Sequence, residues 1–209
     1  LPQQFYYFYA LKQWSGEPPV ISVPSGNFGN LASGILAHIS GLPVKKFIAA
    51  CNANDVVPRF LQTEVYEPHP SVDTLSNAMD VGAPSNFVRI LEIFDNRFVS
   101  LKEKLESASI SDEVTAATMR DVYSQCNYIL DPHGAVGYRA LEDYLERHPD
   151  LRGIVLETAH PVKFDSVNEI IGTQGELPAS VEILMSRKKQ SIEIDNDYAQ
   201  VKEIILSKI

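Results

Sequence analysis

Residues 20–30, with the sequence VISVPSGNFGN, constrain the fold of this chain more than any other stretch. A short apolar run predicts a buried strand, which leads through a turn with Gly26 and Gly29 into the start of a helix. Such a turn directs several backbone N–H groups to one point, where the helix dipole also favours an anion. Because glycine has no Cβ, the backbone can approach that anion closely.

The pattern therefore indicates a phosphate-binding turn, and a plain tight strand-to-helix turn is its structural alternative. No Gly-Lys-Ser or Gly-Lys-Thr follows, so the turn is not a P-loop. Its glycine spacing also differs from that of a dinucleotide-binding fingerprint.

The segments on either side of this turn predict an α/β fold. Residues 20–23 and 46–51 are candidate buried strands, and residues 31–40 between them form a helix of small residues. This order favours a parallel strand pair with a right-handed crossover. A third buried strand is predicted at residues 153–156.

Apolar periodicity and capping residues predict further helices. They cover residues 2–14, 86–97, 111–126 with Ser111 and Asp112 at the cap, and the stretch that follows residues 131–134 and ends near residue 148.

Three other stretches carry weaker predictions. Residues 54–63 are expected to form a short helix interrupted by Pro58. Residues 67–85 are expected to be a loop, and such a long loop favours a functional role. The tail, residues 178–209, is expected to hold two amphipathic helices around a short strand at residues 191–194.

Composition excludes two classes of partner. The formal net charge of −9 argues against a general nucleic-acid binder, and no apolar run approaches the length of a membrane span. The two cysteines, Cys51 and Cys126, lack metal-ligand spacing, so we predict two buried thiols in a cytosolic protein and no metal site. The first residues have no basic region typical of a signal peptide, and we expect them to lie in the middle of a longer protein.

A second candidate site is the segment of residues 157–164, directly after the third predicted strand. Ligands bind at the carboxyl ends of parallel strands. Thr158 offers a hydroxyl that can donate or accept a hydrogen bond. His160 is either an acid–base group or, as we favour, a structural residue, and Lys163 either neutralises an anion or is solvated.

Two further segments leave their alternatives open. In residues 131–138, Asp131 is a candidate helix cap, and His133 is either catalytic or a packing residue. Residues 74–86 are polar and contain glycine, as expected of a substrate-facing wall or of a buried loop tied down by its own side chains.

These motifs together resemble the threonine synthases, a family of fold-type II pyridoxal-phosphate enzymes. The resemblance rests on residues 24–30, 74–82, 84–86, 131–133 and 158–164, with further similarity at residues 1–3 and 6–8. It spans nearly the whole chain in order. It implies an α/β fold in three layers, with a mostly parallel sheet covered by helices on both faces.

The resemblance also implies how the cofactor pyridoxal 5′-phosphate is held. Its phosphate would meet backbone N–H groups of residues 25–30, and Thr158 would hydrogen-bond the pyridine nitrogen. The implied cofactor-binding residues are Ser25, Gly26, Asn27, Phe28, Gly29, Asn30 and Thr158. A neutral hydroxyl leaves that nitrogen less protonated than a carboxylate would, which fits β,γ-replacement chemistry. The family converts O-phosphohomoserine and water to threonine and phosphate.

One departure from the family is large. The Schiff-base lysine and the substrate-binding loop of the family lie in an amino-terminal half with no counterpart here, and no lysine of this chain matches the motif. We therefore expect residues 1–209 to be the carboxy-terminal part of the catalytic domain, with no catalytic residue of its own and no activity alone. The alternatives are another fold-type II enzyme, such as a cysteine synthase or a dehydratase, and a non-catalytic anion-binding module. Residues 75–80 and 158–161 favour threonine synthase over the other enzymes.

Overall fold

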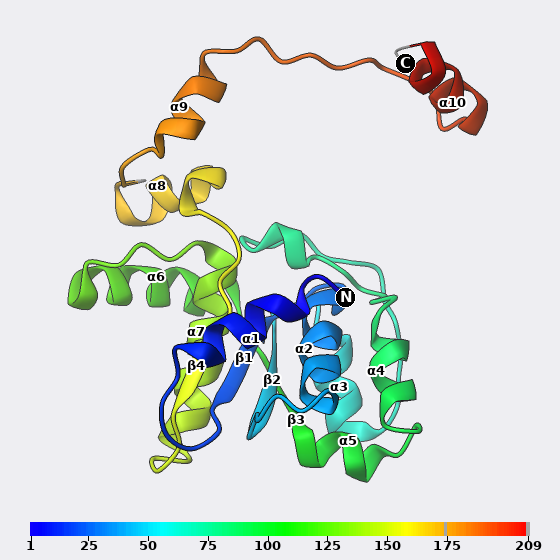
Figure 1. Ribbon diagram of the computed structural model, residues 1–209. Helices are drawn as coiled ribbons and strands as arrows, with labels where there is room; N and C mark the ends of the chain where they lie inside the picture. Colours follow the sequence, from blue (N-terminus) through cyan, green and yellow to red (C-terminus); the bar gives the residue numbers. More distant parts are fainter. Residues whose placement is uncertain (174, 208–209) are drawn as a thin grey trace. The chain divides into compact units, whose positions relative to one another are not determined.

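The computed structural model describes residues 1–173 and 175–207, which divide into two compact units with a boundary after residue 175. The second unit contains α9 (Ala179–Met185) and α10 (Tyr198–Ser207), so the two predicted tail helices are confirmed (Figure 1). The predicted strand at residues 191–194 is wrong, since those residues form no strand. A lone strand would leave its backbone N–H and C=O groups without ladder partners. Among the described helices, none is both long and apolar enough to cross a membrane.

The first unit is built on a four-stranded sheet in which every pair is parallel. Its order is β3-β2-β1-β4, with β1 at Val20–Pro24, β2 at Lys46–Cys51, β3 at Leu105–Ser109 and β4 at Gly153–Val155. The three predicted strands and the parallel pairing of the first two are confirmed. Strand β3 was not predicted, because its sequence LESAS holds a single large apolar residue.

Alternation along the strands explains why both faces of the sheet are covered. Ile21 pairs in register with Phe47, and both belong to the larger core cluster, on one face. Val20 and Ile48 belong to a second cluster on the other face. Strands buried on both faces are typical of parallel sheets between helical layers, so the predicted three-layer α/β class is confirmed.

Five helices contribute side chains to the larger cluster on one face of the sheet (Figure 1). Three helices lie on the side of the sheet that is covered by α7 (Pro132–Glu146). The first set is α1 (Gln4–Lys12), α2 (Gly29–Ile39), α3 (Val56–Thr63), α4 (Phe87–Ile93) and α5 (Phe98–Lys104). The second set is α6 (Asp112–Cys126), α7 (Pro132–Glu146), which packs on the sheet, and α8 (Asp165–Ile171).

Most predicted helices are confirmed, with two corrections. Pro58 does not interrupt α3, because it is the third residue of the helix, where a backbone N–H would have no intrahelical acceptor. Helix α4 ends at Ile93 rather than near residue 97, since Asp95 and Asn96 adopt positive φ angles of 52° and 55°. Helix α5 was not predicted. The predicted loop of residues 67–85 contains one 3₁₀ turn, η1 (Asn77–Met79).

Helix α1 is fixed to α2 by one buried side chain. Tyr7 is fully buried, and its hydroxyl donates to the backbone oxygen of Asn30 at 2.9 Å. A Cβ at Gly34 would overlap the Tyr7 ring, so glycine is required there for the two helices to approach. Tyr7 thus ties α1 to the first turn of α2, next to the glycine-bearing turn.

Candidate functional site

A cavity of about 230 Å³ lies at the carboxyl ends of β1 and β4, which are neighbours in the sheet. From β1 the chain builds β2 and β3 to one side and then returns to place β4 on the other. The point where the strand order reverses in this way is where open α/β sheets bind ligands. The cavity is lined by residues from the glycine-bearing turn, the 3₁₀ turn η1, the start of α7 and the segment after β4.

The glycine-bearing turn presents unpaired donors to this cavity. Phe28 precedes α2 with a left-handed backbone (φ 63°), and no side chain caps the helix. In the part of the chain that the structure describes, the backbone N–H groups of residues 26–31 donate no hydrogen bond. The buried Phe28 ring packs edge-on against Phe87 at 5.5 Å between centroids, which anchors the turn. A phosphate group fits such a set of N–H donors at a helix start.

The two glycines of the turn differ in what surrounds them. A Cβ on Gly26 would lie 2.6 Å from Cα of Met79, so this glycine allows the turn to pack against η1. A Cβ on Gly29 would meet the Asn86 amide nitrogen at 3.5 Å, an ordinary contact. Close packing against the backbone of η1 therefore explains why residue 26 is a glycine. At position 29 the surrounding space would also admit a residue with a Cβ.

The loop of residues 74–86 forms one wall, and the glycine-bearing turn holds it directly. Oδ1 of Asn27 accepts hydrogen bonds from the backbone N–H and the hydroxyl of Ser85, at 2.6 and 3.0 Å. Ala78 and Met79 of this loop line the cavity, and the loop is held by Asn27 from outside rather than by its own side chains alone. That it faces a substrate stays a prediction.

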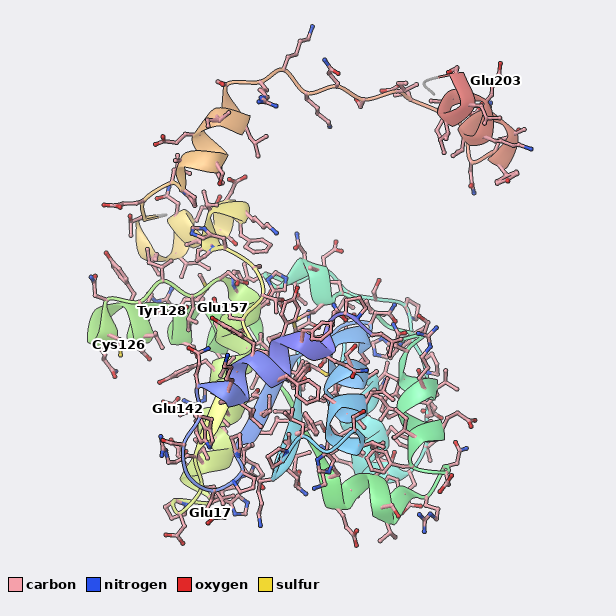
Figure 2. The ribbon with its side chains drawn as sticks, viewed as in Figure 1. Glu17, Cys126, Tyr128, Glu142, Glu157 and Glu203 are labelled. Atoms are coloured by element: carbon pink, nitrogen blue, oxygen red, sulfur yellow. The ribbon has the colours of Figure 1, made fainter. Side chains whose placement is uncertain are left out.

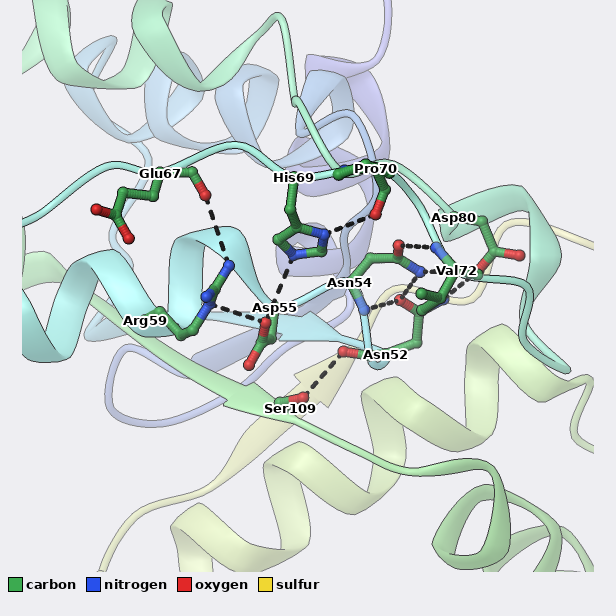
Figure 3. A network of polar contacts seen from close by, with 10 residues as sticks. All are labelled: Asn52, Asn54, Asp55, Arg59, Glu67, His69, Pro70, Val72, Asp80 and Ser109. Carbon is green, nitrogen blue, oxygen red and sulfur yellow. Dashed lines mark hydrogen bonds and ion pairs between the residues drawn. The ribbon is translucent and has the colours of Figure 1, made fainter.

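Two asparagines directly after β2 order the same loop (Figure 3). Nδ2 of Asn52 donates to Oδ1 of Asp80 at 2.8 Å and to the hydroxyl of Thr74 at 2.8 Å. Asn54 exchanges hydrogen bonds with the backbone of Val72, at 2.9 and 3.0 Å. Sequence reasoning missed this network, although polar residues at the end of a buried strand were a usable signal.

Asp131 and His133 form the opposite wall. The predicted cap is confirmed, since Oδ1 of Asp131 accepts from the backbone N–H of His133 at 2.8 Å. The same oxygen lies 2.6 Å from Nδ1 of His133, whose Nε2 accepts from the backbone N–H of Ala78 at 3.1 Å. His133 is therefore a neutral imidazole protonated on Nδ1, and it connects the start of α7 to η1.

Glu157, which also lines the cavity, and Tyr128 lie side by side (Figure 2). The Tyr128 hydroxyl donates to Oε2 of Glu157 at 2.7 Å, a bond that raises the pKa of Tyr128 to about 12. Burial raises the pKa of the Glu157 carboxyl, against the lowering effect of the Tyr128 hydroxyl, and the charge of Asp131 adds to the rise. Neither residue was singled out from the sequence.

Thr158 and Ala159 complete the lining beside Glu157. His160 is exposed and its Nδ1 accepts from the backbone N–H of Val162 at 3.2 Å, which agrees with the structural role favoured for it. Lys163 is exposed, as its solvated alternative requires. Ser25 is the one predicted cofactor-binding residue outside the lining, because its hydroxyl is buried and donates to the backbone oxygen of Val23.

The cavity thus brings together residues 26–30 and Thr158 at the switch point of a parallel sheet. A family model described as pyridoxal-phosphate dependent enzyme matches residues 3–156, about three quarters of the chain. This chain belongs to the pyridoxal-phosphate dependent enzyme family, and its cofactor is accordingly pyridoxal phosphate. A second model, described as the carboxy-terminal region of threonine synthase, matches residues 134–205.

Individual relatives point to the same enzymes. The chain is 50% identical to the threonine synthase of Serratia marcescens over 185 residues, which cover 87% of this chain and 42% of the relative. It is 44% identical to that of Escherichia coli, over 99% of this chain and 48% of the relative. The resemblance to threonine synthases is therefore confirmed, and the chain spans about half the length of the curated relatives it matches.

Solved structures agree with this similarity. The crystal structure of Escherichia coli threonine synthase superposes with a TM-score of 0.86 at 42% identity, covering 99% of this chain and 48% of that one. Pyridoxal-phosphate-bound threonine synthase from Brucella melitensis superposes with a TM-score of 0.85 at 30% identity, covering 98% and 49%. The fold-type II architecture is therefore confirmed.

Proposed function

We propose that residues 1–209 are the carboxy-terminal part of the catalytic domain of a threonine synthase. The whole enzyme would convert O-phosphohomoserine and water to threonine and phosphate. The carrying observation is the cavity that joins the glycine-bearing turn to Thr158, in a chain 44% identical to Escherichia coli threonine synthase. In the cell we propose a cytoplasmic location, which fits the free thiols of Cys51 and Cys126. Cys51 is buried as predicted, whereas the prediction of a buried thiol at Cys126 is wrong, because this residue ends α6 and is exposed.

The unpaired N–H groups of residues 26–31 are the features that fit the cofactor phosphate. In this proposal the backbone of residues 26–30 binds the phosphate, and the positive end of the α2 dipole adds to the attraction. Ser25 contributes to the shape of the turn through its bond to Val23, and its hydroxyl oxygen keeps lone pairs that can accept.

Thr158 would contact the ring at the other end of the cavity. Its hydroxyl can donate to an unprotonated pyridine nitrogen, and as a neutral group it does not favour ring protonation. Bound pyridoxal phosphate would supply an electron sink for the amino-acid substrate. Residues 74–86 would close one side of the site and limit the access of water.

Activity in this proposal requires a lysine from outside residues 1–209. None of the described residues that line the cavity is a lysine, and the nearest in sequence to Thr158, Lys163, is exposed and outside the lining. The chain alone is therefore proposed to bind phosphate weakly and to be inactive. Its partner would be the amino-terminal half of the enzyme.

Reconstitution tests this function. The chain would be assayed with O-phosphohomoserine alone, and again after co-expression with the amino-terminal half of a related threonine synthase. We expect release of threonine and phosphate only from the combined halves. Turnover by the chain alone would contradict the proposal.

The reconstituted product separates the remaining alternatives. A 2-oxo acid in place of threonine would indicate a dehydratase. Phosphate binding by the chain, with no product from any combination, would indicate a non-catalytic anion-binding module.

A further inference from the structure

The carboxyl group of Asp131 is buried with only one of its two oxygens satisfied. Asp131 is fully buried, and its Oδ1 accepts from the backbone N–H and from Nδ1 of His133. Among the described residues, Oδ2 is buried and receives no hydrogen bond. Because a buried anionic oxygen without a donor is costly, a proton donor beside Oδ2 is expected.

Glu157 is the group placed to supply that donor. Its Oε1 accepts from the backbone N–H of Asp131 at 3.4 Å, and its Oε2 accepts from the Tyr128 hydroxyl at 2.7 Å. Burial is the main cause that raises the pKa of Glu157, and the charge of Asp131 also raises it. Two ionised carboxylates in contact are unfavourable, so one of such a pair holds a proton.

Gly134 makes this contact sterically possible. It is the third residue of α7, and a Cβ there would lie 2.5 Å from Oε1 of Glu157. A larger residue would displace the Glu157 carboxyl from Asp131. The start of α7 is therefore shaped to accept this side chain.

We propose that Glu157 carries a proton at neutral pH and donates it to Oδ2 of Asp131, so that the two carboxyl groups share one proton and one negative charge. The titratable groups that face the pair are Tyr128, from the segment before α7, and His133, at the start of α7. Tyr128 donates to Glu157, and neutral His133 donates to Asp131. Each remaining oxygen of the pair is thereby satisfied.

The shared proton makes Glu157 a positioning residue for its neighbour Thr158. The bond would fasten the chain directly after β4 to the first turn of α7, on the cavity wall. If Thr158 meets the pyridine nitrogen, which rests on the proposed function, the pair places one negative charge near that nitrogen rather than two. Lower negative charge there favours the unprotonated ring.

Carbon-13 NMR of the 209-residue chain, labelled at the glutamate carboxyl carbons, tests the proton count directly. At pH 7 we expect one glutamate carboxyl resonance at the chemical shift of a protonated carboxyl group. This resonance should be absent from the spectrum of Glu157→Gln. In Asp131→Asn, which retains a capping oxygen, that resonance should titrate at a pH lower by about one unit or more. A Glu157 resonance already ionised at pH 6 would overturn the proposal.

The pH dependence of stability gives a second, independent readout. The pKa of a glutamate in the unfolded chain lies near its ordinary value of 4.5, whereas the folded state retains the proton to higher pH. Unfolding free energy should therefore fall as pH rises from 4.5 through the raised pKa. Glu157→Gln, whose amide can donate to Oδ2, should lose this fall and keep the stability at pH 7.

Glu169→Gln, which removes an exposed carboxyl on α8, is the matched control and should retain the wild-type slope. An identical slope in wild type and Glu157→Gln would also overturn the proposal. Both measurements use the chain without cofactor or substrate. A failure of the proposed function in reconstitution would therefore leave the proton count unaffected, and the reverse also holds.

Discussion

Nε2 of His133 accepts a hydrogen bond from the backbone N–H of Ala78 at 3.1 Å, across 55 residues of sequence. The bond joins the first turn of α7 to η1, which in turn packs on Gly26. One imidazole thus fixes the separation of two walls of the cavity. Its Nδ1–H tautomer is fixed by Asp131, which accepts from Nδ1, and its neutral form follows from Nε2 accepting from Ala78.

Replacing His133 by alanine should destabilise the first unit by about 1–3 kcal/mol, because the buried carboxylate of Asp131 loses a donor and Ala78 loses an acceptor. Urea unfolding followed by circular dichroism measures this change. His160→Ala, at an exposed histidine that caps a short turn, is the comparison and should cost less than about 1 kcal/mol. Equal losses in the two variants would contradict the role assigned to His133.

The two glycines of the glycine-bearing turn, Gly26 and Gly29, should respond differently to alanine. Gly26→Ala places a methyl group 2.6 Å from backbone Cα of Met79 and should destabilise by about 1–3 kcal/mol. Gly29→Ala meets only an ordinary contact and, in the first turn of α2, should be neutral or stabilise by up to about 1 kcal/mol. Thermal unfolding of the two variants provides the comparison. A more harmful effect of Gly29→Ala on folding would show that the packing around the turn is assigned wrongly.

Asn52→Ala should loosen the loop of residues 74–86. The substitution removes donors from Asp80, Thr74 and Ser76, and we expect a loss of about 2–4 kcal/mol because these buried or partly buried groups lose a partner. Hydrogen exchange should show faster exchange in residues 72–80. The control is Asn77→Ala, at an exposed asparagine of the same loop, where stability should change by less than about 1 kcal/mol.

The hydroxyl of Tyr128 should lose its proton at a higher pH than an ordinary tyrosine does. The hydrogen bond to Glu157 raises the pKa of Tyr128 to about 12, above the ordinary tyrosine value of 10.0. Since the folded state holds this proton longer than the unfolded chain, Tyr128 stabilises less as pH rises from 10 to 12. Absorbance titration of the phenolate measures the shift by difference from Tyr128→Phe.

In Glu157→Gln the Tyr128 pKa should move back toward 10, because the Glu157 carboxyl, which has lost its proton at the alkaline pH of this titration, is no longer there as a charged acceptor. Glu142→Gln, which removes a partly buried carboxyl on α7 that pairs with Arg139, should leave it unchanged. An unchanged Tyr128 titration in Glu157→Gln would show that Glu157 is not its partner.

Much of the secondary structure follows from local sequence signals. Ser111 begins α6 and Asp131 begins α7, as capping residues predict, and the apolar run at residues 46–51 corresponds to β2. Strand β3 escaped prediction because it forms only by pairing with β2. The tail strand was wrong for the converse reason, since apolar alternation without a neighbouring strand does not form a ladder.

The residues of the candidate site likewise fall into those that local sequence signals predicted and those that only the fold revealed. Thr158 and the glycine-bearing turn were found from motif and resemblance, and their role in binding the cofactor stays a proposal. Glu157, Tyr128 and Asn52 were not found, because nothing within a few residues of each shows what it contacts. Their importance comes from partners 22 or more residues away in sequence.

The sequence by itself determined the strand, turn and helix at residues 20–39, since short-range periodicity and backbone preference suffice for such elements. Only the tertiary structure placed β4 beside β1, and thereby Thr158 across the cavity from that turn. It also brought Met79 onto Gly26 and Glu157 onto Asp131. Strand order and close contacts depend on how faces of distant segments pack together, which no local pattern encodes.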